Sequence, residues 1–128
     1  MRFARIVFIV AGVWGILVLT PLFFLVDVTG RQYVPPSVYP QFFYGFLSVA
    51  MAWQIAFLVI GSDPARFRPL MLVGVVEKLG HVLGVLAMYR QARITTLDAQ
   101  GAIPDLVLAL AFVAAFVASR SSPRRDAA

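Results

Sequence analysis

The residues best suited to chemistry lie in one apolar stretch of the chain, residues 70–89. Glu77, Lys78 and His81 lie near its middle, and Glu77 and His81 are four residues apart. On a helix this spacing places the carboxyl group and the imidazole on one face. Such a pair could transfer a proton or hold the polar group of a ligand. Lys78 points about 100° away from Glu77, so it needs either a partner of its own or a path to water.

Several other kinds of site are excluded by the sequence. It contains no cysteine, which rules out disulfides, thiolate metal sites and thiol redox chemistry. One histidine beside one carboxylate supplies too few ligands for a metal unless another chain contributes, and we expect no metal and no other cofactor. There is no phosphate-binding glycine loop and no serine nucleophile elbow. Asp27, Asp63 and Asp98 are interpreted as helix-cap or turn residues.

The composition indicates a membrane protein. Of the 128 residues, 61% are hydrophobic, against about 45–50% in soluble domains. A globule of this size has too little interior to bury the excess, so we expect the lipid bilayer to cover it. The net charge of +5 comes from arginines near the ends of apolar stretches, without the basic stripe and interleaved aromatics of a nucleic-acid-binding protein. Nucleic acid is therefore not an expected partner.

Four apolar stretches predict an all-α fold, a four-transmembrane-helix bundle with up-down-up-down order and short loops. The first stretch has 21 residues without a charge, which is long enough to cross a hydrocarbon core about 30 Å thick and too long for the apolar part of a signal peptide. We expect a single membrane domain, residues 1–128, with a flexible cytoplasmic tail, residues 120–128. The predicted spans are residues 6–26, 40–60, 70–89 and 102–119.

The third span carries charges near its middle and is predicted to depend on its neighbours. Its ten leucines and valines favour insertion by about 0.3–0.6 kcal/mol each. A central acid and base oppose insertion by about 2.5–3.5 kcal/mol each. Because the two sums nearly cancel, other helices must shield the polar face. Pro104 and Asp105 are assigned to the first turn of the last span, where an acid favours the positive end of the helix dipole.

The arginines predict the orientation. Seven fall on the side that holds both termini and the second loop, and three fall on the opposite side. This distribution places both termini in the cytoplasm. The tyrosines agree, because all lie at or near the outer interface of this arrangement, where aromatic rings favour the headgroup boundary. They are Tyr33, Tyr39, Tyr44 and Tyr89.

The second span is expected to face the charged part of the third. Gln54 lies at a depth similar to that of Glu77, and either Gln54 or Ser48 could be its partner. Trp14 and Trp53 lie within about a turn of the same level and could line a cavity. The candidate ligand or proton site consists of Glu77, Lys78, His81, Gln54, Tyr44, Trp14 and Trp53. The alternative is that the charged residues only make interhelical hydrogen bonds, with the tryptophans as packing residues.

Small residues form a second pattern. Gly80 and Gly84 are spaced as a Gly-xxx-Gly pair, and Ala111, Ala115 and Ala118 give the last span a smooth face. Both patterns are typical of close helix approach. The partner is either another helix of the same chain or a second subunit, so a homo-oligomer is one of the two outcomes.

Two segments resemble small bacterial four-helix membrane proteins of the DoxX-like group. They are Gln41-Phe42-Phe43-Tyr44-Gly45-Phe46 and Glu77-Lys78-Leu79-Gly80-His81. The size, the number of spans and the short loops are similar as well. The resemblance implies a compact bundle in a bacterial inner membrane with an accessory or redox-related role, and it assigns no functional residue. Small multidrug exporters are of similar length, but their proton-coupling glutamate lies in the first helix, which has no acid here.

Three functions follow from these observations. The leading hypothesis is a small bacterial inner-membrane protein that binds a lipid or another small apolar ligand in a midplane polar cavity, or that acts as an accessory subunit. The first alternative is a membrane enzyme, an isomerase or oxidoreductase, that uses Glu77 and His81 for proton transfer. The second is a proton-coupled small transporter, expected to be a dimer because one four-helix bundle is small for alternating access.

Overall fold

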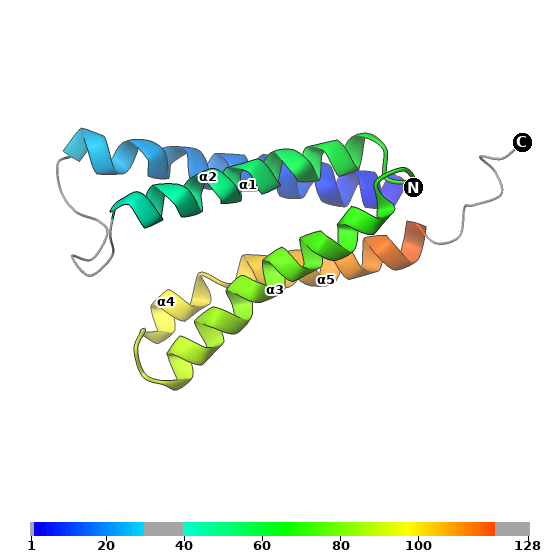
Figure 1. The fold of residues 1–128 in the computed structure, drawn as a ribbon. Coiled ribbons are helices and arrows are strands. Elements are labelled where there is room, and N and C mark those ends of the chain that lie inside the picture. The colour runs from blue at the N-terminus through cyan, green and yellow to red at the C-terminus, as the bar shows by residue number, and fades with distance from the viewer. Residues whose placement is uncertain (1, 30–39, 120–128) are drawn as a thin grey trace, which may run out of the picture.

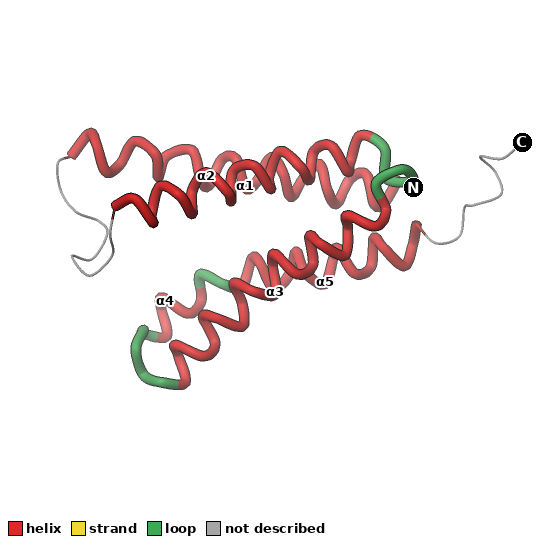
Figure 2. The backbone as a smooth tube through the Cα atoms, in the orientation of Figure 1, coloured by secondary structure: helices red, strands yellow, loops and turns green. Residues whose placement is uncertain are grey.

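The computed structural model describes residues 2–29 and 40–119, which form helices joined by turns (Figures 1 and 2). The helices are α1 (Arg2–Thr29), α2 (Pro40–Ser62), α3 (Arg68–Arg90), α4 (Thr96–Gln100) and α5 (Ile103–Ala118). The described residues contain no strand, which confirms the all-α class. Four segments are long and apolar enough to cross a membrane: Arg2–Phe23, Tyr44–Ser62, Arg68–Arg90 and Thr96–Ala118.

Each predicted span falls on one of the long helices, but the ends of the elements differ. α1 continues to Thr29 and therefore includes Asp27, which the sequence places in a loop. The loop after the third span is more regular than predicted, because residues 96–100 form α4. The predicted connection over residues 30–39, with its two tyrosines, and the tail over residues 120–128 lie outside the described residues.

Local sequence signals explain several helix ends. A proline lies in the first turn of both α3 and α5, where its missing N–H has no helical partner. Thr95 and Asp98 form a capping box at the start of α4, each side chain accepting a hydrogen bond from the backbone N–H of the other. After α3, Ala92 adopts a positive φ of 57°. Its N–H and that of the next residue bond carbonyl groups in the last turn of α3, as in a Schellman motif.

Glycines allow α1 and α2 to pack closely as an antiparallel pair. A Cβ atom on Gly12 would lie 2.8 Å from the backbone oxygen of Gln54, and one on Gly15 would lie 1.8 Å from the side-chain oxygen of the same residue. At the other end of the contact, a Cβ atom on Gly61 would lie 2.8 Å from the side chain of Ile9. A larger residue at Gly12 would meet the backbone of α2 and push the two helices apart, whereas at Gly15 and Gly61 the side chains of Gln54 and Ile9 would have to move.

The small residues singled out in α3 and α5 behave differently from one another. A Cβ atom on Gly80 or Gly84 would meet no atom within 4 Å, so this pair does not bring two helices together within the described part of the chain. Ala115 is fully buried in the core, whereas Ala118 is exposed. The packing glycines of this fold are therefore mainly those of α1 and α2.

The α1–α2 pair and the α3–α5 pair meet at an aromatic core. The ring centroids of Phe8 and Phe112 are 4.3 Å apart, and those of Phe57 and Phe112 are 4.9 Å apart. All three side chains are fully buried. Gly74 of α3 lies against the rings of Phe57 and Phe112, where a side chain would not fit without movement. The core lies toward the end of the molecule where the N-terminus, the α2–α3 turn and the last turn of α5 gather (Figure 1).

Arg68 ties the start of α3 to the end of α5. Its guanidinium group donates hydrogen bonds to the backbone oxygen of Phe116, at 2.9 and 3.3 Å, and to the hydroxyl of Ser119, at 3.0 Å. It also lies 3.8 Å from the centroid of the Phe116 ring. A positive charge is favourable at this position because the last carbonyl groups of a helix carry partial negative charge.

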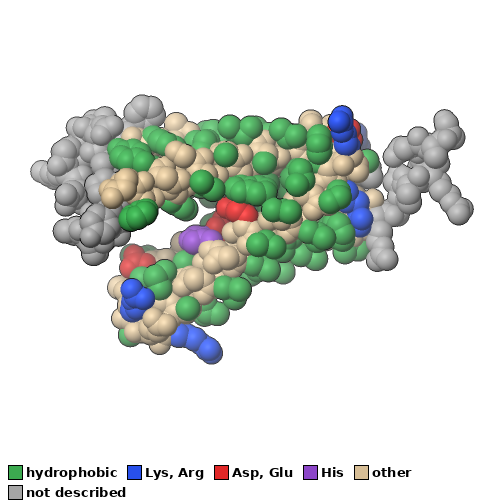
Figure 3. Space-filling view, in the orientation of Figure 1, with side chains coloured by type: hydrophobic (Ala, Val, Ile, Leu, Met, Phe, Trp, Pro, Cys, Tyr) green, Lys and Arg blue, Asp and Glu red, His purple; other side chains and the backbone are tan. Residues whose placement is uncertain are grey.

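Apolar side chains also cover the outer surface of the helices (Figure 3). In the most apolar window of each candidate span, only 17–33% of the residues are buried inside the protein. Leu17, Leu83 and Leu110 are each at least 60% exposed. Soluble monomers rarely expose so extensive an apolar surface, so the structure supports a lipid bilayer environment.

Away from the aromatic core, the two helix pairs separate (Figures 1 and 2). α1 packs along α2, and α3 packs along α5, but α2 and α3 have few contacts with each other. The helices are therefore joined at one end and splayed at the other, in contrast to the compact bundle that the resemblance implies. The separation leaves a cleft between the pairs.

Candidate functional site

The cleft between the two helix pairs has a volume of about 750 Å³, within the range typical of ligand sites. Each of the four long helices contributes to its lining, which is mainly apolar. The histidine and acidic side chains lie where the surface is hollowed (Figure 3). The cleft thus combines an apolar interior with one polar wall, formed by α3 and α5.

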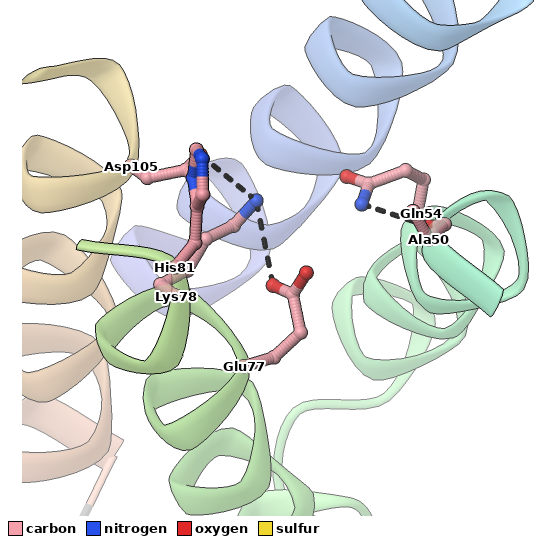
Figure 4. Close-up of polar contacts among 6 residues, drawn as sticks. All are labelled: Ala50, Gln54, Glu77, Lys78, His81 and Asp105. Atoms are coloured by element: carbon pink, nitrogen blue, oxygen red, sulfur yellow. Dashed lines mark hydrogen bonds and ion pairs between the residues drawn. The ribbon is translucent and has the colours of Figure 1, made fainter. Parts of the chain in front are cut away.

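Lys78 is the centre of the polar wall (Figure 4). Its side chain is only 6% exposed, and its Nζ donates a hydrogen bond to Oδ1 of Asp105 at 3.3 Å. Oε2 of Glu77 lies 3.5 Å from the same Nζ, and the Phe57 ring centroid lies 5.3 Å from it. The two carboxylates and the ring face offset the cost of burying the ammonium group. The contact with Asp105 also joins α3 to α5, so α5 supplies the shielding that α3 was expected to need, although the sequence placed the second span opposite these charges.

The position of Lys78 corrects one expectation from the sequence. The angle between neighbouring residues of a helix argues against a contact between Glu77 and Lys78, but the structure brings their charged atoms to 3.5 Å. Long side chains can span that angle. The contact is an ion pair without hydrogen-bond geometry, since Oε2 of Glu77 accepts no hydrogen bond from the described residues. The separate partner expected for Lys78 exists, and it is Asp105.

Asp105 is the site residue that the sequence reasoning missed. It does lie in the first turn of α5, where it was placed as a residue that favours the helix dipole. That turn reaches Lys78, near the middle of α3, because α4 and the break at Gly101 and Ala102 occupy the first part of the candidate span Thr96–Ala118. The available signal was a lysine in one apolar span and an acid in the next, since consecutive antiparallel spans pack side by side.

His81 contacts the other oxygen of Asp105. Its Nδ1 lies 2.5 Å from Oδ2 of that residue, and the ring is half exposed and lines the cleft. The contact sets the orientation of the ring and leaves Nε2 as the nitrogen that a ligand can meet. A carboxylate that orients an imidazole is a common arrangement for proton transfer.

Two buried oxygen atoms in this region have no hydrogen-bond partner among the described residues, namely Oε1 of Gln54 and Oε2 of Glu77. Gln54 is 2% exposed, and its Nε2 donates to the backbone oxygen of Ala50 at 3.0 Å. The Gln54 and Glu77 side chains extend from α2 and α3 toward the same space (Figure 4). Buried polar atoms are normally paired. Oε2 of Glu77 has its ion pair with Lys78, and Oε1 of Gln54 lies against Gly15 of α1.

The other predicted site residues are divided between the cleft and its surroundings. Trp14, Gln54, Glu77, Lys78 and His81 line the cleft together. Trp53 lines an adjoining groove that also includes Glu77, and it packs against the aromatic core. Tyr44 packs between α1 and α2. Neither suggested partner of Glu77 bonds to it, because Ser48 is exposed and the amide of Gln54 donates to its own helix.

Neither a metal site nor a known family defines the function. Among the described residues, no three histidine, aspartate or glutamate side chains are placed to hold a metal ion. No family model, curated protein or solved structure matches the chain. The function is therefore argued from the cleft and its polar wall.

Proposed function

We propose that this chain is a small multi-pass membrane protein that binds a lipid or another small apolar ligand in the cleft between its helix pairs. The observation that carries the proposal is an apolar cleft of about 750 Å³ with a cluster of charged side chains from α3 and α5 on one wall. In ligand sites, apolar surface takes the hydrocarbon part and a few polar groups orient the rest. Ionisable residues inside a membrane are costly, and they usually serve such a site.

The proposal includes four spans in up-down-up-down order with both termini in the cytoplasm. Of the described arginines, four lie at the joined end, at the start of α1, in the α2–α3 turn or at the start of α3, and two lie at the splayed end, where α3 ends or just after it. They are Arg2, Arg5, Arg66 and Arg68, then Arg90 and Arg93. The positive-inside bias favours the joined end in the cytoplasm. A bacterial inner membrane is part of the same proposal, and it rests on the resemblance to the DoxX-like group.

Single-cysteine labelling tests the topology, because the chain has no cysteine of its own. We expect Arg93→Cys to react with a membrane-impermeant maleimide in intact cells. Arg66→Cys should react only after the membrane is permeabilised. If both positions react from the same side, residues 70–89 do not cross the bilayer and the topology is wrong.

Two glycine substitutions test the cleft as the ligand site. Gly80 and Gly84 are both exposed glycines of α3 with open space around them, but only Gly80 lines the cleft. We expect Gly80→Phe to reduce the lipid that co-purifies with the protein in mild detergent, as measured by native mass spectrometry. Gly84→Phe should retain it. Wild-type protein that never retains a ligand, or equal retention by both variants, would count against the proposal.

A second candidate, an enzyme of proton transfer, is favoured by the contact between His81 and Asp105. An imidazole oriented in this way could move a proton to or from a membrane-dissolved substrate. Proteoliposomes made in heavy water from a total lipid extract would then incorporate deuterium into a lipid. His81→Gln should abolish the exchange, while Leu72→Ala, on an exposed part of α3, should not alter it. No incorporation with wild-type protein would exclude this candidate for the lipids tested.

A further inference from the structure

We infer that the cleft binds an uncharged long-chain alcohol whose hydroxyl group bonds to Nε2 of His81, an inference that rests on the ligand-binding function proposed above. The starting point is the His81 ring, which lines the cleft and has half of its side-chain surface exposed. Its Nδ1 contacts Asp105, and its Nε2 has no hydrogen-bond partner among the described residues. An accessible polar atom on the wall of an apolar cleft is where the head group of a lipid would bind.

Asp105 determines which nitrogen of His81 carries the proton in the neutral ring (Figure 4). Its Oδ1 accepts a hydrogen bond from Nζ of Lys78 at 3.3 Å, and its Oδ2 lies against Nδ1 of His81. A carboxylate paired with a lysine only accepts hydrogen bonds, so Nδ1 is the donor in this contact. Nε2 is therefore an acceptor when the ring is neutral and a donor when the ring is charged.

The charges of the whole cluster argue against an acidic head group. Glu77 and Asp105 are acids, and Lys78 and His81 are bases. The cluster is thus neutral when the imidazole is charged, and it has one surplus negative charge when the imidazole is neutral. Neither state offers a surplus positive charge, and the Lys78 side chain is only 6% exposed. A carboxylate or phosphate in the cleft would add an unbalanced negative charge, which is costly away from water.

The remaining head groups differ in whether they donate or accept hydrogen bonds. A hydroxyl group does both, so it can bond to Nε2 of His81 in either charge state of the ring. An ammonium group only donates and an ether oxygen only accepts, so each matches one of the two states. The hydrocarbon chain of the alcohol would lie on the apolar lining from α1 and α2, which includes Val18, Leu19 and Phe46.

Competition in liposomes tests the inference. The full chain is reconstituted in phosphatidylcholine, which has no hydroxyl group, together with hexadecanol that carries a photoreactive diazirine on its chain. Labelling is read as the mass increase of the intact protein. The unlabelled competitors share one chain length: hexadecanol, hexadecyl methyl ether, hexadecylamine and hexadecanoate. The comparison is made at about pH 5 and at about pH 9, on either side of the ordinary titration range of histidine.

Hexadecanol should compete at both pH values. At the higher pH, where the ring is neutral, we expect it to compete about tenfold better than the ether, whose capped oxygen has no proton to donate. At the lower pH, where the ring is charged, we expect it to compete about tenfold better than hexadecylamine, which cannot accept. Hexadecanoate should compete least at the higher pH, where it is ionised.

Two variants separate the head-group contact from the cleft itself. His81→Phe keeps a ring but removes Nε2, so hexadecanol and the ether should compete equally. Gly80→Phe places a large side chain in the cleft, and labelling that hexadecanol can compete away should be lost. The control Leu72→Ala lies on an exposed part of α3 outside the cleft, and it should behave like wild type. Thermal melts establish that each variant is folded, and the wild-type pH comparison decides the matter if His81→Phe is not.

The outcomes distinguish this inference from the function on which it rests. Equal competition by hexadecanol and the ether at both pH values would overturn the inference, and so would strongest competition by the acid or the amine. An unchanged preference for hexadecanol in His81→Phe would place the head group on another residue, which also overturns it. In these cases the cleft would still be a ligand site. If no probe competes, or if Gly80→Phe is labelled like wild type, the ligand-binding function itself fails.

Discussion

Replacing Asp105 with leucine would leave the buried ammonium group of Lys78 with only one nearby carboxylate, that of Glu77 at 3.5 Å. The reverse change, Lys78→Met, would leave Asp105 with His81 and would leave Glu77 without a cation. The double variant removes both members of the pair that joins α3 to α5. Comparing the two single variants with the double variant measures the coupling between the helices, free of the effect of each side chain alone.

The expected magnitude follows from the separation and the burial of the two groups. At an effective dielectric constant of about 20, unit charges 3.3 Å apart attract by about 5 kcal/mol, and much of this is lost to desolvation. Removing one partner of a buried pair costs about 3–5 kcal/mol. We expect about 3 kcal/mol for Asp105→Leu, because Glu77 remains, and about 2 kcal/mol for Lys78→Met, because both acids are partly exposed.

The double variant should lose only about 2 kcal/mol of unfolding free energy, which corresponds to a coupling of about 3 kcal/mol. Unfolding by dodecyl sulfate in mixed maltoside micelles, followed by helical circular dichroism, measures all three values. Losses that add to within about 0.5 kcal/mol would refute the reasoning, since the pair would then contribute nothing to the packing of α3 on α5.

The same unfolding assay checks three further predictions. Gly12→Ala should lower the unfolding free energy by about 1–3 kcal/mol, because the added methyl group would meet a backbone oxygen of α2. Gly84→Ala has open space and should raise the unfolding free energy by up to about 1 kcal/mol through helix propensity. Equal effects of the two substitutions would contradict the packing described. Ala92→Gly should raise the unfolding free energy by about 1 kcal/mol, because residue 92 has a positive φ that is unfavourable for residues with a side chain. A lower unfolding free energy would be evidence against that conformation. Arg68→Ala should lower the unfolding free energy by about 1.5–3 kcal/mol, because it removes the hydrogen bonds to the end of α5. Arg68→Lys should recover only part of this loss, because lysine lacks the planar guanidinium fork.

The all-helical architecture was predictable because its determinants are local. The length of an apolar stretch decides whether a helix can cross a membrane, and four such stretches correspond to the four long helices. The charged residues of the third stretch were recognisable for the same reason, because any ionisable group in an apolar segment stands out. Glu77, Lys78 and His81 do lie together on the wall of the cleft.

Other features of the structure could not be predicted from the spacing of residues along the sequence. The spacing of Gly80 and Gly84 predicted a close helix approach there, but close packing occurs at Gly12 and Gly15. A spacing rule shows that glycines share a face, but it does not show which face meets another helix. The role of Asp105 was hidden in the same way, because a first-turn acid has a sufficient local explanation.

By itself, then, the sequence determined that the chain has four apolar helices and that the third carries a costly group of charges. Only the tertiary structure decided that Asp105 pairs with Lys78, that the two helix pairs splay apart, and that Gln54 lines the same cleft as the charged residues of α3. The physical reason is that helix formation and membrane insertion depend on neighbours along the chain. Pairing of buried charges and the opening of a cleft depend on how segments distant in the chain pack against one another.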